Sequence, residues 1–248
     1  MADPAPLVLL HPFPLDARAY DAVAPRLRAG GRWTWAPEFP GFGGAPPEDR
    51  PDIEAFADRV AEGVAREAPG GRAFLCGISM GGYVALAAAA RRPETVLGLV
   101  LAGTRAEADS EEARRGRAES AARVRREGPG PFTRELLARL IAPENAAALR
   151  AGQAIAGEQP GAAVALALEA LGARADRVAD LPGMRVPALL VSGDADPVAP
   201  PQVMAGLAAG LPDARTLTLA GVGHLAALER PADFADAVLA FLEEVAAP

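Results

Sequence analysis

One pentapeptide, Gly77-Ile78-Ser79-Met80-Gly81, restricts the fold of this chain more than any other stretch. An apolar run at residues 73–76 precedes it, and an alanine-rich segment at 83–90, typical of a helix, follows it. This order predicts a buried strand that turns sharply into a helix, with Ser79 at the apex of the turn. Glycines at positions 77 and 81 leave room for such a turn. A glycine-rich turn in which the serine has no role would explain the same glycines. The other motifs of the chain are therefore needed to distinguish the two interpretations.

The apolar run at residues 7–10 has no polar alternation, as expected for a strand that is covered on both faces of a parallel sheet, and further segments with strand character recur along the chain. Helical segments separate these runs. The expected strands are residues 7–10, 33–36, 73–76, 96–101, 186–192 and 215–219. The expected helices among them are residues 17–27, 53–67, 83–90, 201–209 and 231–245. The alternation predicts an α/β fold with about six mostly parallel strands, right-handed crossovers and helices on both faces.

The alternation stops after the fourth predicted strand, and no strand is expected between residues 105 and 180. Glycine and proline divide this region into helical segments at residues 110–127, 131–141, 143–156 and 162–171. We therefore expect a core formed by residues 1–104 and 181–248, with a helical cap inserted at residues 105–180.

Composition excludes several classes of function. The net charge of −7 disfavours nucleic acid or an anionic membrane as a partner. No apolar run reaches the roughly 18–20 residues of a membrane helix, and the first residues lack the basic segment of a secretory signal. Cys76 is the only cysteine, which fits a reducing compartment. We expect a cytoplasmic protein, and the sequence gives no indication of its oligomeric state.

Neither a metal nor a cofactor is expected. Two widely separated histidines and one buried cysteine cannot form an ordinary zinc site. The glycine fingerprint of dinucleotide binding does not follow the first strand.

A serine that acts as a nucleophile needs a base to accept its proton and an acid to orient that base. His224, in a glycine-rich loop after the last strand, is the preferred base, because His11 lies at the end of the first strand, where backbone is expected to contribute. The acid is expected on the loop after the fifth strand, which offers Asp194 and Asp196. We prefer Asp196, because Asp194 follows the strand closely enough to cap a turn, and Asp194 stays the alternative.

An oxyanion formed at the serine needs preorganised N–H donors. The amide of Met80, next to Ser79, is one candidate. Pro12 and Pro14 have no N–H, so Phe13 is the second expected donor. His11 and Leu225 are expected to line the substrate pocket.

Five motifs in this order resemble those of the α/β-hydrolase superfamily, over nearly the whole chain. They are residues 11–14 (the oxyanion loop), 40–43 (a glycine loop), 77–81 (the nucleophile turn), 193–196 (the acid loop) and 223–231 (the histidine loop). Pro12 departs from the family, which usually has glycine there. The first strand begins at residue 7, which leaves no room for the leading hairpin of the full fold. Sequences that resemble the lyases of this superfamily have lysine directly after the histidine, whereas this chain has Leu225 there.

The resemblance implies a serine hydrolase that cleaves small carboxylic esters or lactones through an acyl-enzyme, similar to carboxylesterase and 3-oxoadipate enol-lactonase-like members. Dehalogenases and epoxide hydrolases, which resemble this fold but use aspartate as nucleophile, are disfavoured by Ser79. The alternatives are an enol-lactonase, a carbon–carbon bond hydrolase or a cofactor-free perhydrolase with the same triad. A ligand-binding homologue without catalysis is a further alternative, because a fold alone does not confer function.

Overall fold

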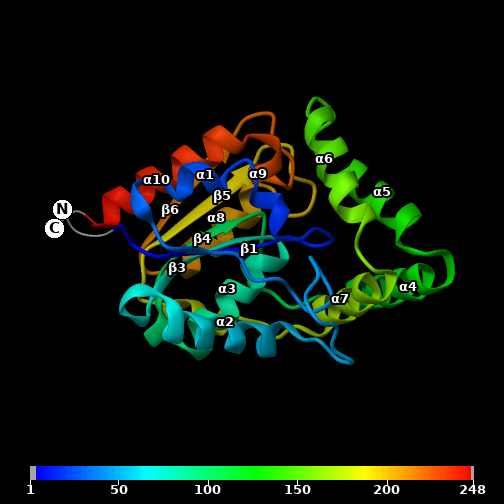
Figure 1. Ribbon diagram of the computed structural model, residues 1–248, viewed down its shortest axis with the longest axis horizontal. Coiled ribbons are helices and arrows are strands. Elements are labelled where there is room, and N and C mark those ends of the chain that lie inside the picture. Colours follow the sequence, from blue (N-terminus) through cyan, green and yellow to red (C-terminus); the bar gives the residue numbers. More distant parts are fainter. Residues whose placement is uncertain (1–3, 247–248) are drawn as a thin grey trace.

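The computed structural model describes residues 4–246 and is built around a parallel sheet of six strands (Figure 1). The strands are β1 (Leu7–Leu10), β2 (Thr34–Trp35), β3 (Ala73–Ile78), β4 (Val96–Ala102), β5 (Ala188–Gly193) and β6 (Ala214–Leu219). Their order across the sheet is β2-β1-β3-β4-β5-β6, and every neighbouring pair is parallel. The predicted α/β-hydrolase fold with about six parallel strands is confirmed.

The apolar runs of the strands divide between two hydrophobic layers, one on each face of the sheet. On β1, Val8 and Leu10 belong to one buried cluster, whereas Leu7 and Leu9 belong to the other. Successive side chains of a strand point to opposite faces, so a strand covered on both sides needs apolar residues at every position. This is why β1, β3 and β4 read as apolar runs, whereas the edge strand β6 contains polar residues and is half-buried to exposed.

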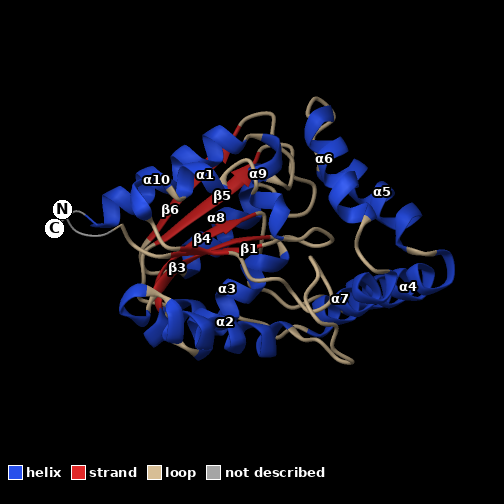
Figure 2. Ribbon diagram, viewed as in Figure 1, coloured by secondary structure: helices blue, strands red, loops and turns tan. Residues whose placement is uncertain are grey.

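Helices cover both faces of the sheet (Figure 2). Those of the core are α1 (Ala24–Leu27), α2 (Ile53–Glu67), α3 (Met80–Arg91), α8 (Pro201–Gly210), α9 (Ala226–Glu229) and α10 (Pro231–Ala246). Buried residues of α2, α3 and α8 share one cluster, and those of α1, α9 and α10 share the other.

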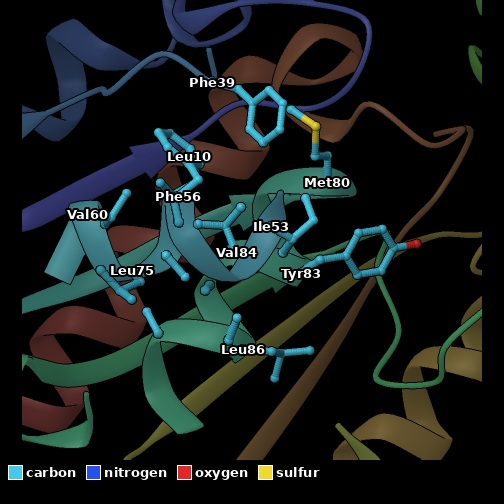
Figure 3. Packing of buried hydrophobic residues seen from close by; sticks show 14 of the residues in the cluster. Leu10, Phe39, Ile53, Phe56, Val60, Leu75, Met80, Tyr83, Val84 and Leu86 are labelled. Atoms are coloured by element: carbon cyan, nitrogen blue, oxygen red, sulfur yellow. The ribbon is translucent and has the colours of Figure 1, made fainter. Parts of the chain in front are cut away.

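The layer formed by α2 and α3 includes Met80, the residue that follows Ser79 (Figure 3). Asp52 caps α2, accepting a hydrogen bond from the Ala55 amide at 2.6 Å. Ile53, Phe56 and Val60 of α2 pack with Val84 of α3. Tyr83 lies at the edge of this cluster, with its hydroxyl directed away from it (Figure 3).

The helix predicted over residues 17–27 is wrong. A 3₁₀ turn at Ala17–Tyr20 is followed by the short α1, which has proline in its first turn. Pro25 has no N–H, so a continuous helix would lack one backbone hydrogen bond and would meet a steric clash at this point. The side chain of Asp16 caps the 3₁₀ turn as expected, accepting from the Arg18 amide at 3.0 Å.

Four further helices follow β4 and lie beyond the carboxyl ends of the strands (Figure 1). They are α4 (Glu111–Glu127), α5 (Pro129–Leu140), α6 (Ala146–Gly157) and α7 (Gly161–Ala173). Helix α4 packs on α7, and α5 packs on α6. We refer to residues 105–180 as the insertion, and its role as a cap stays a prediction.

Candidate active site

The loops after β1 and β3, which are expected to contribute to the site, lie next to each other where the strand order of the sheet reverses. From β1 the chain passes to β2 on one side and then returns to β3 on the other. In open parallel sheets, ligands bind at the carboxyl ends of the strands that flank such a reversal. Phe13 follows β1, and Ser79 follows β3.

Ser79 has a strained backbone conformation. Its φ of 51° and ψ of −112° make it the only non-glycine residue with positive φ in the part of the chain that the structure describes. Its amide donates to the Ala102 carbonyl at 2.9 Å, and its carbonyl accepts from the Gly82 amide and the Thr104 hydroxyl. Strain of this kind persists only where the surroundings fix the backbone, and it concentrates at functional sites.

The glycines around Ser79 have steric reasons that the sequence could only suggest. A Cβ on Gly77 would lie 2.2 Å from the Gly81 carbonyl oxygen, and a Cβ on Gly81 would lie 1.9 Å from the Leu10 carbonyl oxygen. Both distances are far shorter than a non-bonded contact. The beginning of α3 can therefore approach β1 and β3 only because these positions have no side chain.

His224 is paired with Asp196. The imidazole Nδ1 lies 2.8 and 3.0 Å from the two carboxylate oxygens, and the two side chains are buried. Because the carboxylate accepts, the neutral imidazole has its proton on Nδ1, which leaves Nε2 with a free lone pair. An imidazole held in this tautomer by a carboxylate can act as a general base.

The environment of Asp196 favours its charged form. Burial alone would raise the pKa of this carboxyl group, but the hydrogen bonds and electrostatic attraction from His224 and the backbone hydrogen bonds outweigh burial, and the net pKa is lowered. The amides of Val198 and Ala199 also donate to Oδ1, at 2.7 and 3.0 Å. Asp194, by contrast, is exposed and accepts from the Gly221 amide at 2.8 Å. The structure thus brings Asp196, and not Asp194, to the histidine.

The two amides expected to hold an oxyanion are available. Within residues 4–246, neither the Phe13 nor the Met80 amide donates a hydrogen bond to another group of the protein. Met80 is the first residue of α3, so its N–H is one of those that an α-helix leaves without a partner.

Ser79, His224 and Phe13 line one cavity of about 350 Å³. Its apolar walls come from α3, from the insertion and from the loop after β5. They are Tyr83, Phe132, Leu136, Leu140, Leu168, Leu171 and Val198. Arg117, Ser120 and Arg139 add polar groups from α4 and α5. A larger cavity of about 600 Å³, lined by Asp16, Glu38 and Gln159 among others, contains neither Ser79 nor His224.

The expectation that His11 and Leu225 line the substrate pocket is not met. Their exposed fractions are 2% and 1%, and neither belongs to the lining of the Ser79 cavity. His11 instead holds the first loop: its Nε2 accepts from the Phe39 amide at 3.0 Å, and its Nδ1 lies 3.2 Å from the Pro12 carbonyl oxygen. Burial lowers the pKa of His11 to about 4, which keeps it neutral and able to accept this bond.

The pocket residues that the insertion supplies are not among those expected from the sequence. Phe132, Leu136 and Leu140 are spaced by four along α5, which puts them on one face of the helix. That spacing is visible in the sequence, but the same pattern predicts any buried helix face. Only the packing of α5 over the carboxyl ends of the strands turns this face toward Ser79.

In the described part of the chain, no three His, Cys, Asp or Glu side chains gather as metal ligands would. None of the helices within residues 4–246 combines the length and the apolarity that crossing a membrane requires.

The chain is similar to known proteins over nearly its whole length. The model of the alpha/beta hydrolase family matches residues 7–237. A protein of Aromatoleum aromaticum named pimeloyl-[acyl-carrier protein] methyl ester esterase is 34% identical, over 92% of this chain and 94% of its own length.

Two solved structures are similar in sequence and in fold. A thermophilic esterase from Thermogutta terrifontis, with malate bound, has a TM-score of 0.90 and 31% identity, over 97% of this chain and 90% of that one. The enol-lactonase from Burkholderia xenovorans LB400 has a TM-score of 0.83 and 27% identity, over 96% of this chain and 92% of that one.

Proposed function

The chain belongs to the α/β-hydrolase family and is a hydrolase, and on this premise we propose that it cleaves small carboxylic esters or lactones through an acyl-enzyme intermediate. The observation that carries the proposal is one cavity that contains a strained serine and a carboxylate-held histidine. The names of the relatives, two esterases and an enol-lactonase, support the same class of substrate.

In the first half of the reaction, the hydroxyl of Ser79 attacks the carbonyl carbon of the ester while His224 Nε2 takes the hydroxyl proton. Asp196 keeps the imidazole in the required tautomer and stabilises the imidazolium. The amides of Phe13 and Met80 donate to the oxygen that becomes negative in the tetrahedral intermediate. When the intermediate collapses, the imidazolium returns its proton to the departing alcohol, and the acyl group stays on Ser79.

In the second half, a water molecule attacks the acyl carbonyl while His224 again takes a proton. The second tetrahedral intermediate releases the acid and restores the Ser79 hydroxyl. For a lactone, the alcohol stays attached to the acyl group, so one hydroxy acid leaves at this step.

The cavity walls suggest the kind of acyl or alcohol group that fits. The cavity wall is mostly apolar, and two arginines of the insertion, Arg117 and Arg139, also line it. Arg117 pairs with Asp109, whereas Arg139 is exposed on α5. We propose that the preferred esters are apolar next to the ester bond and carry a negative charge at the far end. The relative that acts on an acyl-carrier-protein ester and the neighbour that binds malate are consistent with this preference.

The nucleophile is tested with Ser79→Ala. Hydrolysis of p-nitrophenyl acetate is expected to fall by at least about 10⁴-fold, while the melting temperature stays nearly unchanged. A fluorophosphonate probe is expected to label the wild type and not the variant. Turnover retained by Ser79→Ala, or a wild type that neither turns over esters nor labels, would contradict the proposal and favour a ligand-binding homologue.

The substrate is tested with a panel of neutral esters, carboxylate-bearing esters and lactones of matched length. Carboxylate-bearing substrates are expected to have a KM about 2- to 5-fold lower than neutral ones, the range for an exposed ion pair. Arg139→Gln is expected to abolish this difference without changing kcat for neutral esters. An equal KM for neutral and charged substrates in the wild type would rule out the charge preference.

A further inference from the structure

Glu229, the last residue of α9, has a carboxylate surrounded by hydrogen-bond donors. Its exposed fraction is 6%. Oε1 accepts from the Leu225 amide at 3.0 Å. Oε2 accepts from the Gly223 amide at 2.9 Å, from the Ala142 amide at 2.9 Å and from the Asn145 side-chain amide at 2.8 Å.

Two of these four donors flank His224 in the chain. The amide of His224 itself donates to the Leu140 carbonyl at 2.7 Å. Three consecutive amides, those of residues 223, 224 and 225, are therefore fixed by Glu229 or by the end of α5. The loop that carries the histidine has no regular secondary structure at these residues, so these bonds take the place of a helix or strand in fixing its backbone.

The other two donors, Ala142 and Asn145, belong to the segment between α5 and α6. The insertion and the histidine loop thus share one buried carboxylate. Gly223 allows this approach, because a Cβ at this position would lie 2.3 Å from the Leu140 carbonyl oxygen. The position of His224 is consequently tied to that of the insertion segment 140–145.

We propose that Glu229 is a positioning residue that holds the His224 imidazole in its reactive place and couples it to the insertion. The inference rests on the proposed function, in which His224 transfers the proton of Ser79. Glu229 does not line the Ser79 cavity, so it acts through the backbone of the histidine loop and not on the substrate.

The chemistry of the four donors requires a carboxylate. All four are N–H groups, and a carboxylate accepts through both oxygens and donates nothing. A glutamine of the same shape accepts with one oxygen only and turns an NH₂ group toward N–H donors. Glu229→Gln therefore leaves buried donors without partners while it adds almost no change in volume.

The decisive experiment compares Glu229→Gln with Glu62→Gln, a matched change at an exposed glutamate of α2. For Glu229→Gln we expect kcat for p-nitrophenyl acetate to fall roughly 10- to 100-fold, because a small misplacement of a reacting group has an effect of this size. We expect KM to change by less than about 2-fold. The rate of fluorophosphonate labelling is expected to fall in parallel. Glu62→Gln is expected to match the wild type in all three.

A purely structural role would lower the melting temperature but leave kcat of the folded protein unchanged. That outcome, measured well below the melting temperature, would overturn the proposal. A second readout is the low-field proton resonance of the His224 Nδ1–H group, which is expected to shift or broaden in Glu229→Gln and to stay in place in Glu62→Gln.

A second series decides the matter if Glu229→Gln does not fold. Asn145→Ala removes one donor from Oε2, and Asn145→Asp puts a second carboxylate against the first. We expect kcat to fall more in Asn145→Asp than in Asn145→Ala, with KM little changed in either. Equal kcat values in both variants and the wild type would contradict the coupling.

Failure of the proposed function would be recognised separately. A wild type that hydrolyses no ester and does not label refutes the serine hydrolase, whatever Glu229 does. The resonance of His224 still tests the positioning role in that case, because it reports the place of the imidazole without any turnover.

Discussion

At the scale of the residue, Asp194 and Asp196 are two positions apart and yet have different surroundings. Asp196 is buried and contacts His224, while the exposed Asp194 accepts the Gly221 amide and so closes the loop before the histidine. Chain distance alone could not separate them, because the two carboxylates follow the same strand. The difference depends on which of the two loop positions turns inward.

This difference predicts opposite results for two isosteric substitutions. Asp196→Asn is expected to lower kcat by about 10²- to 10⁴-fold, because an amide does not hold the Nδ1–H tautomer of the imidazole. Asp194→Asn is expected to leave kcat within about 3-fold of the wild type and to lower stability by roughly 1 kcal/mol through its weaker acceptor. Ester hydrolysis and urea unfolding of both variants provide the check; a larger loss of kcat in Asp194→Asn would assign the acid to Asp194.

His11 predicts a pH dependence of stability. Its pKa is lowered from 6.5 to about 4 by burial, so between these pH values the unfolded chain binds a proton that the folded chain does not. Stability from this residue is complete above pH 6.5 and is lost as pH falls toward 4, by about 3 kcal/mol at most.

The measurement is the free energy of unfolding from pH 8 to pH 4 for the wild type and for His11→Gln. The difference between the two proteins is expected to change mainly within the window from 6.5 to 4. Glu38, which lies 3.4 Å from His11 and has its pKa raised to about 7 by burial, is present in both proteins. The same titration of His224→Gln separates the two histidines of the chain. If the wild-type and His11→Gln curves run parallel, His11 has the same protonation in the folded and unfolded chains, and the prediction is wrong.

At the scale of the element, the turn from β3 into α3 depends on atoms that approach one another closely. Gly81 is a helix residue, and glycine there has a cost of about 1 kcal/mol relative to alanine by propensity alone. Its neighbour, the Leu10 carbonyl oxygen, leaves no space for that alanine. Packing against β1 therefore outweighs helix propensity at this position.

Gly81→Ala is accordingly expected to destabilise the protein by about 1–3 kcal/mol or more, since backbone has to move. Gly206→Ala in α8 is the matched control, because nothing lies within 4 Å of a Cβ there. It is expected to stabilise by up to about 1 kcal/mol. Thermal and urea unfolding of the two variants measure the contrast, and a Gly81→Ala protein as stable as the control would refute the steric explanation.

At the scale of the whole molecule, a buried ionic cluster joins the two ends of the insertion to the core. Asp109, just before α4, pairs with Arg174, just after α7, at 2.7 Å, and also with Arg117. The Arg174 guanidinium lies 4.1 Å over the ring of Tyr83 in α3. The insertion is thus fastened next to the residues that follow Ser79.

Arg174→Gln is expected to lower the free energy of unfolding by roughly 1.5–3 kcal/mol, the range for a hydrogen bond to a charged group. The loss is expected to stay within this range because Asp109 still pairs with Arg117. Arg125→Gln is the control, since its pair with Glu169 also joins α4 to α7 but is about half exposed. It is expected to cost less than about 1 kcal/mol. Urea unfolding measures both losses. Equal losses in the two variants would mean that the buried Asp109 cluster contributes no more to stability than the exposed ion pair.

The order of strands and helices and the turn at Ser79 follow from residues that are close together in the chain. Local physical rules are sufficient there: apolar runs must be covered, and glycines permit a tight corner. These rules are not sufficient over residues 17–27, where Pro25 interrupts the continuous helix that is expected. They also leave open the choice between Asp194 and Asp196, although the preference for Asp196 agrees with the contact to His224.

The side chains that face Ser79, and those that hold His224, depend on how distant parts of the chain pack together. Most of the cavity wall comes from α4, α5 and α7 of the insertion, and the histidine loop is fixed by Glu229 and the end of α5. The contacts from segment 140–145 to Glu229 and His224 join residues 84 to 87 positions apart in the chain, mostly through backbone amides, which every residue type except proline possesses. A pattern of side chains along the sequence therefore does not predict these contacts. The covering of a strand or the capping of a turn can be predicted, because it depends on neighbouring residues.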